Sequence, residues 1–548
     1  MIWIRAAWAV TAVVPTGMSM EAACLDASVD RIEVTSDIAD SSLCTIDRAV
    51  TIVGDTETGD WPAVPSLLFV DGSEGSTLES LSLSGGSPAD ALSINETDIS
   101  GTDLYVGGHL RLEDGTAVFE RIEVVNANGT GISVQATADT TRLSLTECDV
   151  HDNADGGIVA QGNTVPITIY SEYSIFYDNI RSGAGGAILA DGVDVLVEDV
   201  GSSFYTNKSE QGGAIMLDAA SAELKQTSFE DNHAFAGSVY SGLGSAIAAF
   251  GGSTVTCTGC TFLSHTGDGP ALYANASELT LIDSSMLDNS SSSGSPGALQ
   301  VANGVSTSIT GSMFCGNVGA LDTSSAMSAS SARLDGGIID LVTTTFSAND
   351  VSTPGAALVL RDFELAELQN LTFVHNAGGA ALHSSGGDTL SVVNTVFDNN
   401  VSAYDLHSED TPETASWSWI RWVGDEPGSM SATDSETLDD AEWDTDLFTP
   451  RDCETYPIPG ATSPLLGTGD PEIMASQGID WIGAYDADGP DTGDTGSTPD
   501  TADPDTGEST DDTGLPSTVS WYSGGCRSTG ALVLLLLLVR ATRDADGG

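Results

Sequence analysis

Five ionisable side chains follow three successive copies of a repeated motif in the middle of the chain. Each copy contains a phenylalanine. Aspartate stands two residues after two of these phenylalanines, and a basic residue stands four or five residues after all three. Acids and bases arranged in this way can move protons on a polysaccharide or bind calcium, while arginine or lysine stabilises developing charge. The alternative is a set of solvated turn residues. The candidates for catalysis are Asp178, Arg181, Lys208, Asp231 and His233.

The eight cysteines offer a second kind of chemistry. In an exported chain they are expected to form disulfides. Cys24 and Cys44 bracket the N-terminal segment and are the best-placed pair. Cys257 and Cys260 both fall at positions predicted to point inward, so they are either two buried thiols or a tight bridge at a corner. The sequence assigns no partner to Cys315 or Cys453.

An acidic segment near the C-terminus holds four Asp-Thr-Gly triplets. From Asp486 to Pro516 there are ten acidic residues and no basic residue. The same triplet is catalytic in aspartic proteases, but there two copies lie in packed lobes and share a proton. A low-complexity segment cannot bury them, so an extended, self-repelling linker is the better interpretation. Calcium is the one cofactor suggested, with candidate ligands Asp486, Asp488, Asp491 and Asp494.

The composition limits the class of partner. The 548 residues include 80 acidic and 16 basic side chains, for a formal net charge of −64. A chain with so few cations cannot neutralise phosphates, which excludes a nucleic-acid binder. It also argues against docking on anionic lipid through a basic patch. The hydrophobic share of 40% is enough for a folded body.

A repeat of 24 to 33 residues runs through the middle of the chain. In each copy a large apolar residue is followed three positions later by asparagine, with His265 in place of asparagine once. A Gly-Gly-small-aliphatic motif follows several copies, as at Gly185–Ile188 and Gly212–Ile215. The repeated asparagines are Asn128, Asn153, Asn179, Asn207, Asn232, Asn289, Asn317, Asn349, Asn376 and Asn400.

This repeat predicts one coil of a parallel β-helix per copy. Stacked coils lie ~4.8 Å apart, so equivalent residues form columns along the rod. Apolar columns would fill the core, and an asparagine column suits a corner, because its amide can bond to the next asparagine. The expected fold is all-β, a right-handed parallel β-helix of about 11–13 coils, followed by a disordered acidic linker.

The two ends carry export signals. Residues 1–23 have a charged start, a short apolar run and small residues, as expected of a signal peptide; the alternative is a buried first strand. At the other end, Gly524-Gly525-Cys526 precedes nine apolar residues and two arginines. Nine residues span about half of the hydrocarbon core, which favours a sorting signal over a permanent membrane anchor.

Two resemblances rest on these motifs. The paired Gly-Gly-Ala-Ile and Phe-x-x-Asn repeats resemble those of bacterial surface proteins within the pectin-lyase-like right-handed β-helix superfamily. The C-terminus resembles the glycine-cysteine signals of myxosortase-type systems. That resemblance implies processing by a sorting protease near Gly525 and modification of Cys526 for attachment to a membrane.

The predicted organisation has six parts. They are a signal peptide (1–23), an N-terminal cap with the first coils (24–100), the repeat body (101–401), an irregular insert and closing segment (402–487), the acidic linker (488–516) and the sorting signal (517–548).

The predicted function is that of an exported protein held at the cell surface or outer membrane. It would be structural or adhesive and would bind an extracellular glycan or a surface protein without catalysis. The alternative is a polysaccharide lyase or glycosidase acting on an extracellular glycan. Contact with the membrane is expected only through the C-terminal anchor.

Overall fold

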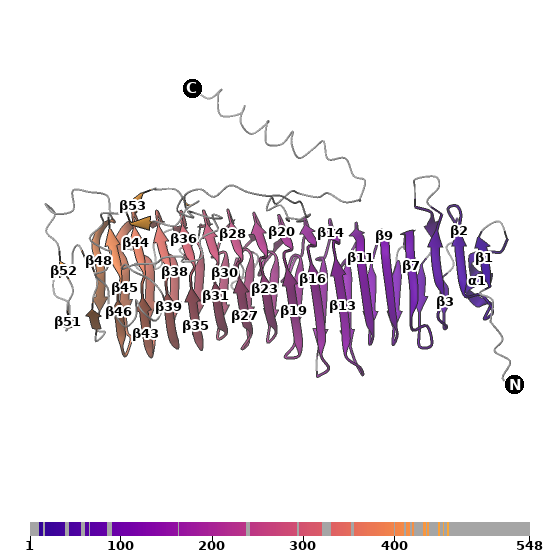
Figure 1. The fold of residues 1–548 in the computed structure, drawn as a ribbon, viewed down its shortest axis with the longest axis horizontal. Coiled ribbons are helices and arrows are strands. Elements are labelled where there is room, and N and C mark those ends of the chain that lie inside the picture. The colour runs from indigo at the N-terminus through magenta and orange to yellow at the C-terminus, as the bar shows by residue number, and fades with distance from the viewer. Residues whose placement is uncertain are drawn as a thin grey trace, which may run out of the picture. The chain divides into compact units, whose positions relative to one another are not determined.

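The computed structural model describes most of residues 10–409 and a few short stretches beyond (Figure 1). The described ranges are 10–14, 17–38, 43–55, 61–64, 66–84, 90–162, 164–236, 242–292, 295–319, 330–351, 356–398, 400–409, 413–416, 419–420, 431–433, 436–437, 448–449, 453 and 458–459. They form a parallel β-solenoid of about 13 turns, which confirms the predicted fold class. The acidic linker and the C-terminal signal lie outside the described residues.

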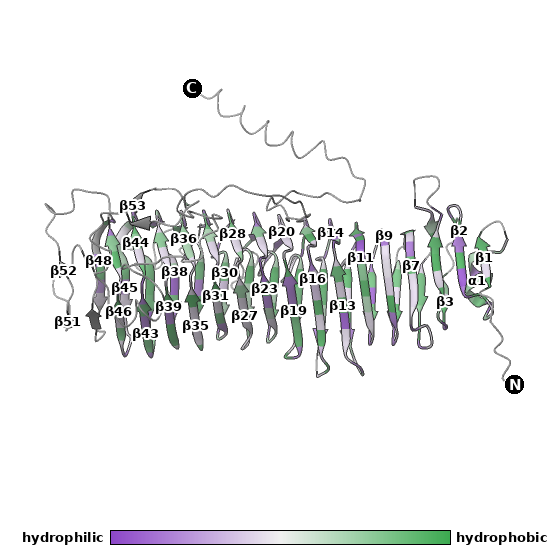
Figure 2. Cartoon of the chain, viewed as in Figure 1, coloured by the Kyte–Doolittle hydropathy of each residue, from purple (hydrophilic) through white to green (hydrophobic). Residues whose placement is uncertain are grey.

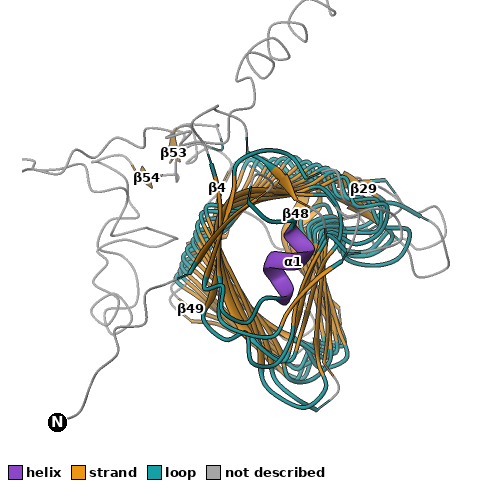
Figure 3. Cartoon of the chain, turned by 90° about the vertical axis from the view of Figure 1, so that its right-hand side faces the viewer, coloured by secondary structure: helices purple, strands orange, loops and turns teal. Residues whose placement is uncertain are grey.

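Each coil contributes strands to three faces, which Figure 3 shows end-on. The long-strand face contains β1 (Thr11–Val14), β2 (Arg31–Val34), β4 (Thr51–Gly54), β7 (Ser76–Leu83), β9 (Asp98–Val106), β11 (Thr116–Val125), β13 (Thr141–Thr146), β16 (Ile167–Glu172), β19 (Val195–Val200), β23 (Ser221–Lys225), β27 (Thr254–Thr258), β31 (Glu278–Ile282), β35 (Ser306–Thr310), β39 (Ile338–Val342), β43 (Leu365–Gln369), β46 (Leu390–Val393), β49 (Glu413–Ser416) and β51 (Ser431–Thr433).

The short-strand face carries the strands that follow the long ones; in β7, β9 and β11 one strand serves both faces. Its members are β5 (Ala63–Val64), β14 (Asp149–His151), β17 (Ile175–Tyr177), β20 (Ser203–Tyr205), β24 (Ser228–Glu230), β28 (Thr261–Leu263), β32 (Ser285–Leu287), β36 (Met313–Cys315), β40 (Thr345–Ser347), β44 (Thr372–Val374), β47 (Val396–Asp398), β50 (Trp419–Ile420) and β52 (Glu436–Thr437).

The third face closes each coil. It contains β3 (Cys44–Ile46), β6 (Leu67–Phe69), β8 (Leu92–Asn95), β10 (Leu110–Glu113), β12 (Ile132–Ala136), β15 (Ile158–Gly162), β18 (Ile188–Asp191), β22 (Ile215–Asp218), β26 (Ile247–Phe250), β30 (Leu272–Asn275), β34 (Leu299–Ala302), β38 (Ser330–Asp335), β42 (Ala356–Arg361), β45 (Ala377–Ser385) and β48 (Val401–Glu409). Two-residue strands precede it at a corner: β21 (Lys208–Ser209), β25 (His233–Ala234), β29 (Thr266–Gly267), β33 (Ser290–Ser291), β37 (Val318–Gly319) and β41 (Asp350–Val351).

The core is built from the inward columns. Side chains alternate between inside and outside along a strand, as the burial pattern of β16 shows. Figure 2 shows hydrophobic and hydrophilic residues within the same strands. The phenylalanines predicted to anchor the short-strand face point inward, and Phe176, Phe204, Phe229 and Phe262 stack with ring centroids 4.6 to 5.1 Å apart. Each of these rings is fully buried, so burial of large side chains along the whole axis stabilises the fold.

The asparagine column forms a continuous hydrogen-bonded ladder. The Oδ1 atom of Asn207 accepts from both the backbone N–H and the Nδ2 of Asn179, at 3.2 and 3.0 Å. The Nδ2 of Asn207 donates to the Phe176 carbonyl and to Oδ1 of Asn232, at 2.8 and 3.0 Å. The same pattern joins most rungs from Asn153 to Asn400, and His265 occupies one rung between Asn232 and Asn289.

One predicted member of the ladder is wrong. Asn128 is exposed, and Ala127 stands in the ladder position, where its N–H donates to Oδ1 of Asn153. The reason is register: Val124, not Val125, pairs with Val150 of the next coil. A shift of one residue moves a side chain to the opposite face.

The Gly-Gly motif at the following corner has a steric cause. Gly212 has a φ of +61°, in the left-handed region that favours glycine. A Cβ on Gly212 would collide with the Ile215 carbonyl, and one on Gly213 would collide with the Ser245 carbonyl of the next coil. The motif therefore lets the chain turn sharply while adjacent coils stay in contact.

The N-terminal end of the core is closed by α1 (Met20–Leu25), which Figure 3 shows across the opening of the coils. Met20 and Ala23 are buried there, and a disulfide joins Cys24 to Cys44. Strand β1 pairs in parallel with β2, so the structure places part of the predicted signal peptide in the first coil. The signal peptide itself stays a prediction. Among the described residues, no helix is long and apolar enough to span a membrane.

The C-terminal side extends further than the repeat pattern indicates. Strands β49 to β52 continue the parallel pairing beyond residue 401. Cys453 then forms a disulfide with Cys315, 138 residues earlier. Cys315 lies on the outward side of β36, yet its side chain is fully buried. β53 (Phe448–Thr449) and β54 (Ile458–Pro459) flank Cys453 in sequence and pair with each other in antiparallel fashion. The disulfide therefore holds Cys453 against the short-strand face.

We expect Cys453→Ser to make Cys315 reactive toward iodoacetamide in the folded protein. The substitution removes the covalent partner of Cys315. The outward-facing thiol of Cys315 is then free to react when the segment around residue 453 is no longer tied to it. Peptide mass spectrometry after native labelling measures this. The buried thiols Cys148, Cys257 and Cys260 are internal controls and should stay unlabelled in both proteins. Labelling of Cys315 in the unsubstituted protein would contradict the disulfide.

Candidate functional site

The structure does not gather the five predicted catalytic residues into one constellation. Lys208 and His233 are paired on adjacent coils in β21 and β25. Lys208 also pairs with Ile180 on the other side, so Arg181 stands one residue out of that register. The Arg181 guanidinium instead lies 3.8 Å from Asp155.

The two predicted aspartates occupy equivalent positions on the solenoid but are not on adjacent coils. Asp178 and Asp231 are both exposed, each directly before its ladder asparagine, with φ values of +50°. Thr206 occupies the same position on the coil between them, with a φ of +55°. Two coil spacings separate the carboxylates by ~10 Å, too far to act on one bond as a close pair. Asp178 and Asp231 are therefore exposed corner residues.

The bridge considered for Cys257 and Cys260 is not formed. Both are free, buried thiols in the solenoid interior. They face the same interior as Asp199, a fully buried carboxylate that accepts from the hydroxyls of Ser171 and Thr227 at 2.5 and 2.6 Å. Burial raises the pKa of Asp199 above its usual range. Because these groups are buried and the carboxylate of Asp199 is satisfied by neighbouring hydroxyls, they are structural.

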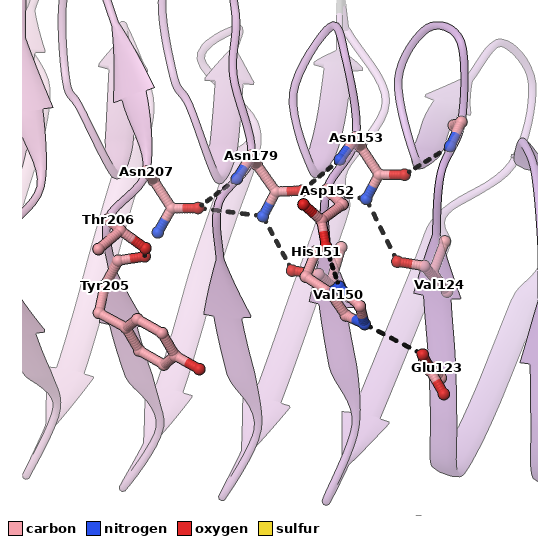
Figure 4. Close-up of polar contacts among 11 residues, drawn as sticks. Glu123, Val124, Val150, His151, Asp152, Asn153, Asn179, Tyr205, Thr206 and Asn207 are labelled. Carbon is pink, nitrogen blue, oxygen red and sulfur yellow. Dashed lines mark hydrogen bonds and ion pairs between the residues drawn. The ribbon is translucent and has the colours of Figure 1, made fainter. Parts of the chain in front are cut away.

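A different cluster lies on the outward side of the short-strand face, and Figure 4 shows two of its members, His151 and Tyr205. The residue after each inward anchor points outward, and on three consecutive coils it is His151, Tyr177 and Tyr205. The rings stack almost parallel, with centroids 4.3 Å apart for His151 and Tyr177 and 5.0 Å apart for the two tyrosines. We call these three residues the aromatic ladder.

Carboxylates border the aromatic ladder. Glu123 and Asp149 form the neighbouring outward column on adjacent coils. The His151 ring is hydrogen-bonded to two carboxylates. Its Nδ1 lies 2.8 Å from Asp152, and its Nε2 lies 3.1 Å from Glu123. Glu230 pairs with Tyr205 on the next coil and follows the ladder in the same column.

These neighbours shift the protonation of the imidazole and of Asp149. Burial alone would lower the pKa of His151, but the bonds to Glu123 and Asp152 outweigh it, and the pKa is raised. Burial raises the pKa of Asp149; the charge of His151 opposes this, and Glu123 adds to it. The two hydrogen-bonded carboxylates therefore favour the protonated form of His151, and Asp149 is harder to ionise than an ordinary aspartate.

The tyrosines keep their protons at any ordinary pH. Burial raises the pKa of Tyr205 to about 12, with further contributions from Asp149, Asp178 and Asp152. The pKa of Tyr177 is raised for the same leading reason. Among the described residues, no hydrogen bond is found for either phenol hydroxyl. The aromatic ladder thus presents two half-buried tyrosine rings with their hydroxyls, and nearby carboxylates, along the rod, while the His151 ring itself is buried beside them.

The predicted calcium ligands Asp486, Asp488, Asp491 and Asp494 lie outside the described residues, as do Gly525 and Cys526. Within the part of the chain that the structure describes, no group of three or more histidine, cysteine or acidic side chains is arranged to hold a metal ion.

The comparisons with known proteins are sparse. No family model matches the sequence, and no curated protein matches it. Among solved structures, the tailspike protein 3 of bacteriophage CBA120 aligns with a TM-score of 0.33 at 13% identity, covering 75% of this chain and 57% of the tailspike. A GH87 α-1,3-glucanase catalytic unit from Streptomyces thermodiastaticus aligns with a TM-score of 0.27 at 13% identity, covering 78% and 66%. At these values neither match assigns an activity to this chain.

Proposed function

We propose that the chain is an exported, surface-anchored β-helix protein that binds a glycan through its aromatic ladder, without catalysis. The aromatic ladder is the observation that carries the proposal. It lines up two half-buried tyrosine rings and their hydroxyls on adjacent coils, at the coil spacing of ~4.8 Å. A repeating polymer lying along the rod could bond to several coils in succession, and many modest hydrogen bonds add up when the surface is already ordered.

The arrangement of acids supports binding over hydrolysis. Glycoside hydrolysis uses one carboxyl group as acid and another as base or nucleophile, on either side of the bond. Here Glu123 and Asp152 are both hydrogen-bonded to His151, so of the three acids beside the imidazole only Asp149 makes no hydrogen bond to it.

A surface protein of this kind would be attached through the C-terminal signal after its recognition by a sorting protease.

Catalysis by a lyase or glycosidase is the second candidate. The observation in its favour is Asp149, whose raised pKa suits a proton donor and which is in register with Glu123. Incubation with a panel of polysaccharides, with and without calcium, separates the two functions. We expect no reducing ends and no unsaturated products; their release, and its loss in Asp149→Asn, would contradict the non-catalytic proposal.

Removal of either tyrosine should weaken glycan binding by about tenfold or more, because each substitution deletes a hydroxyl and a ring edge from the centre of the contact. The measurement is a glycan microarray followed by titration of the best ligand, using Tyr177→Ala and Tyr205→Ala. Tyr170→Ala is the matched control, since Tyr170 is an outward tyrosine on the long-strand face of the same coil as Tyr177. Equal effects of all three substitutions would contradict the proposed face.

A further inference from the structure

We infer that the glycan bound by the aromatic ladder carries free amino groups, as a de-N-acetylated amino-sugar polymer does. This inference rests on the proposed function and specifies the chemical class of its ligand. It follows from the charges that surround the aromatic ladder and from the direction in which the aromatic ladder runs.

Acids lie on three sides of the aromatic ladder. Glu123 and Asp149 stand in the outward column beside it. Asp152 and Asp178 stand at the corner on its other side, each directly before a ladder asparagine. Glu230 continues the column of the aromatic ladder beyond Tyr205 and is exposed.

Three basic residues lie near the aromatic ladder among the described residues, and each has other partners. His151 belongs to the aromatic ladder itself, and its two ring nitrogens are hydrogen-bonded to Glu123 and Asp152. Arg181 lies near Asp155, and Lys208 follows the inward Asn207 at the start of β21, where it pairs with His233. The hydroxyls of Tyr177 and Tyr205 therefore sit in a negative potential, to which the net charge of −64 adds.

This charge distribution discriminates among glycans. An acidic polysaccharide such as a polyuronate would be repelled, and a neutral one would gain nothing from the carboxylates. A polymer with an ammonium group on each sugar could pair successive ammoniums with the carboxylates at the coil spacing, while the tyrosine hydroxyls hydrogen-bond to the sugar.

The test compares three oligosaccharides of equal length by isothermal titration calorimetry at about pH 6. They are a glucosamine hexamer with free amines, its fully N-acetylated counterpart and an oligogalacturonate. We expect the free-amine hexamer to bind at least tenfold more tightly than the N-acetylated one, with an affinity that falls as salt is added. No binding is expected for the oligogalacturonate.

General attraction of a polycation to an acidic rod is controlled with matched variants. Asp149→Asn with Asp178→Asn removes two charges beside the aromatic ladder and should weaken amine binding by about tenfold. Asp340→Asn with Glu367→Gln removes two charges that are in register on adjacent coils of the long-strand face, and should change binding less than threefold. Equal losses in the two double variants would overturn the inference. If the double variant beside the aromatic ladder is unfolded, Asp178→Asn alone serves, since Asp178 is exposed.

The outcomes for the inference and for the proposed function are distinct. Tyrosine-dependent binding of a neutral or acidic glycan, with none of the free-amine hexamer, overturns the inference and leaves the proposed function standing. Absence of binding to every glycan overturns both.

Discussion

Asn207→Ala should destabilise the coils around it by about 3–6 kcal/mol. The substitution deletes the acceptor used by the backbone N–H and Nδ2 of Asn179 and the donor used by the Phe176 carbonyl. All three groups are buried beside the core, and each unsatisfied buried polar group costs about 1–3 kcal/mol. The cavity left by the amide adds to the loss.

Native-state hydrogen exchange measures this effect coil by coil, because stability need not be uniform along a solenoid. Protection should fall most in β17 and β20. Asn128→Ala is the matched control: Asn128 belongs to the same sequence repeat but is exposed outside the ladder, so its removal should change stability by no more than about 0.5 kcal/mol. A similar loss in both variants would contradict the ladder as described.

His265→Asn should remove a step of acid destabilisation that the natural chain undergoes. His265 is buried in the asparagine ladder, and burial lowers its pKa to about 4 from an ordinary value of 6.5. The unfolded chain therefore binds the proton more readily than the folded one between these pH values. The stabilisation from the neutral imidazole is complete above about pH 6.5, declines as the pH falls, and is lost once the pH passes below about 4.

The size of the step is about 2–3 kcal/mol between pH 7.5 and pH 4.5. Chemical unfolding of both proteins at the two pH values, followed by circular dichroism, gives it as the difference between their pH dependences. Asparagine should also raise stability at pH 7.5, because its amide can complete the ladder where Nε2 of His265 is buried without a partner among the described residues. An acid dependence unchanged by the substitution would show that His265 is not the titrating group.

The fold is readable from the sequence because a solenoid repeats its local environments. The column of phenylalanines and the column of asparagines each appear in the sequence as one residue type at one spacing. Because the same position in every coil faces the same surroundings, the spacing alone assigns His265 to the asparagine column. The error at Asn128 arises where β11 runs unbroken across two faces, so that Val124 and Val125 both fit the anchor position.

The candidate site is harder to predict for a physical reason. Outward residues of a solenoid have no common packing requirement, so their types vary freely and no repeat marks them. His151, Tyr177 and Tyr205 become a cluster only when the residue after each anchor is compared across coils. The ion pairs of His151 depend on the side-chain positions of Glu123 and Asp152, which spacing does not give.

The Cys315–Cys453 bridge shows a second limit. Its two halves are 138 residues apart, and Cys453 follows a region without the repeat pattern. Nothing in the local sequence indicates that the chain returns to the short-strand face there. The repeat pattern does not predict contacts between the solenoid and a segment that lies outside the repeats.

A crystal structure of the protein soaked with the free-amine glucosamine hexamer tests the central claim most directly. The account predicts that the sugar chain lies along the rod over His151, Tyr177 and Tyr205, with ammonium groups near Asp149 and Asp178. A hexamer bound on the long-strand or third face, with the aromatic ladder empty, would contradict it.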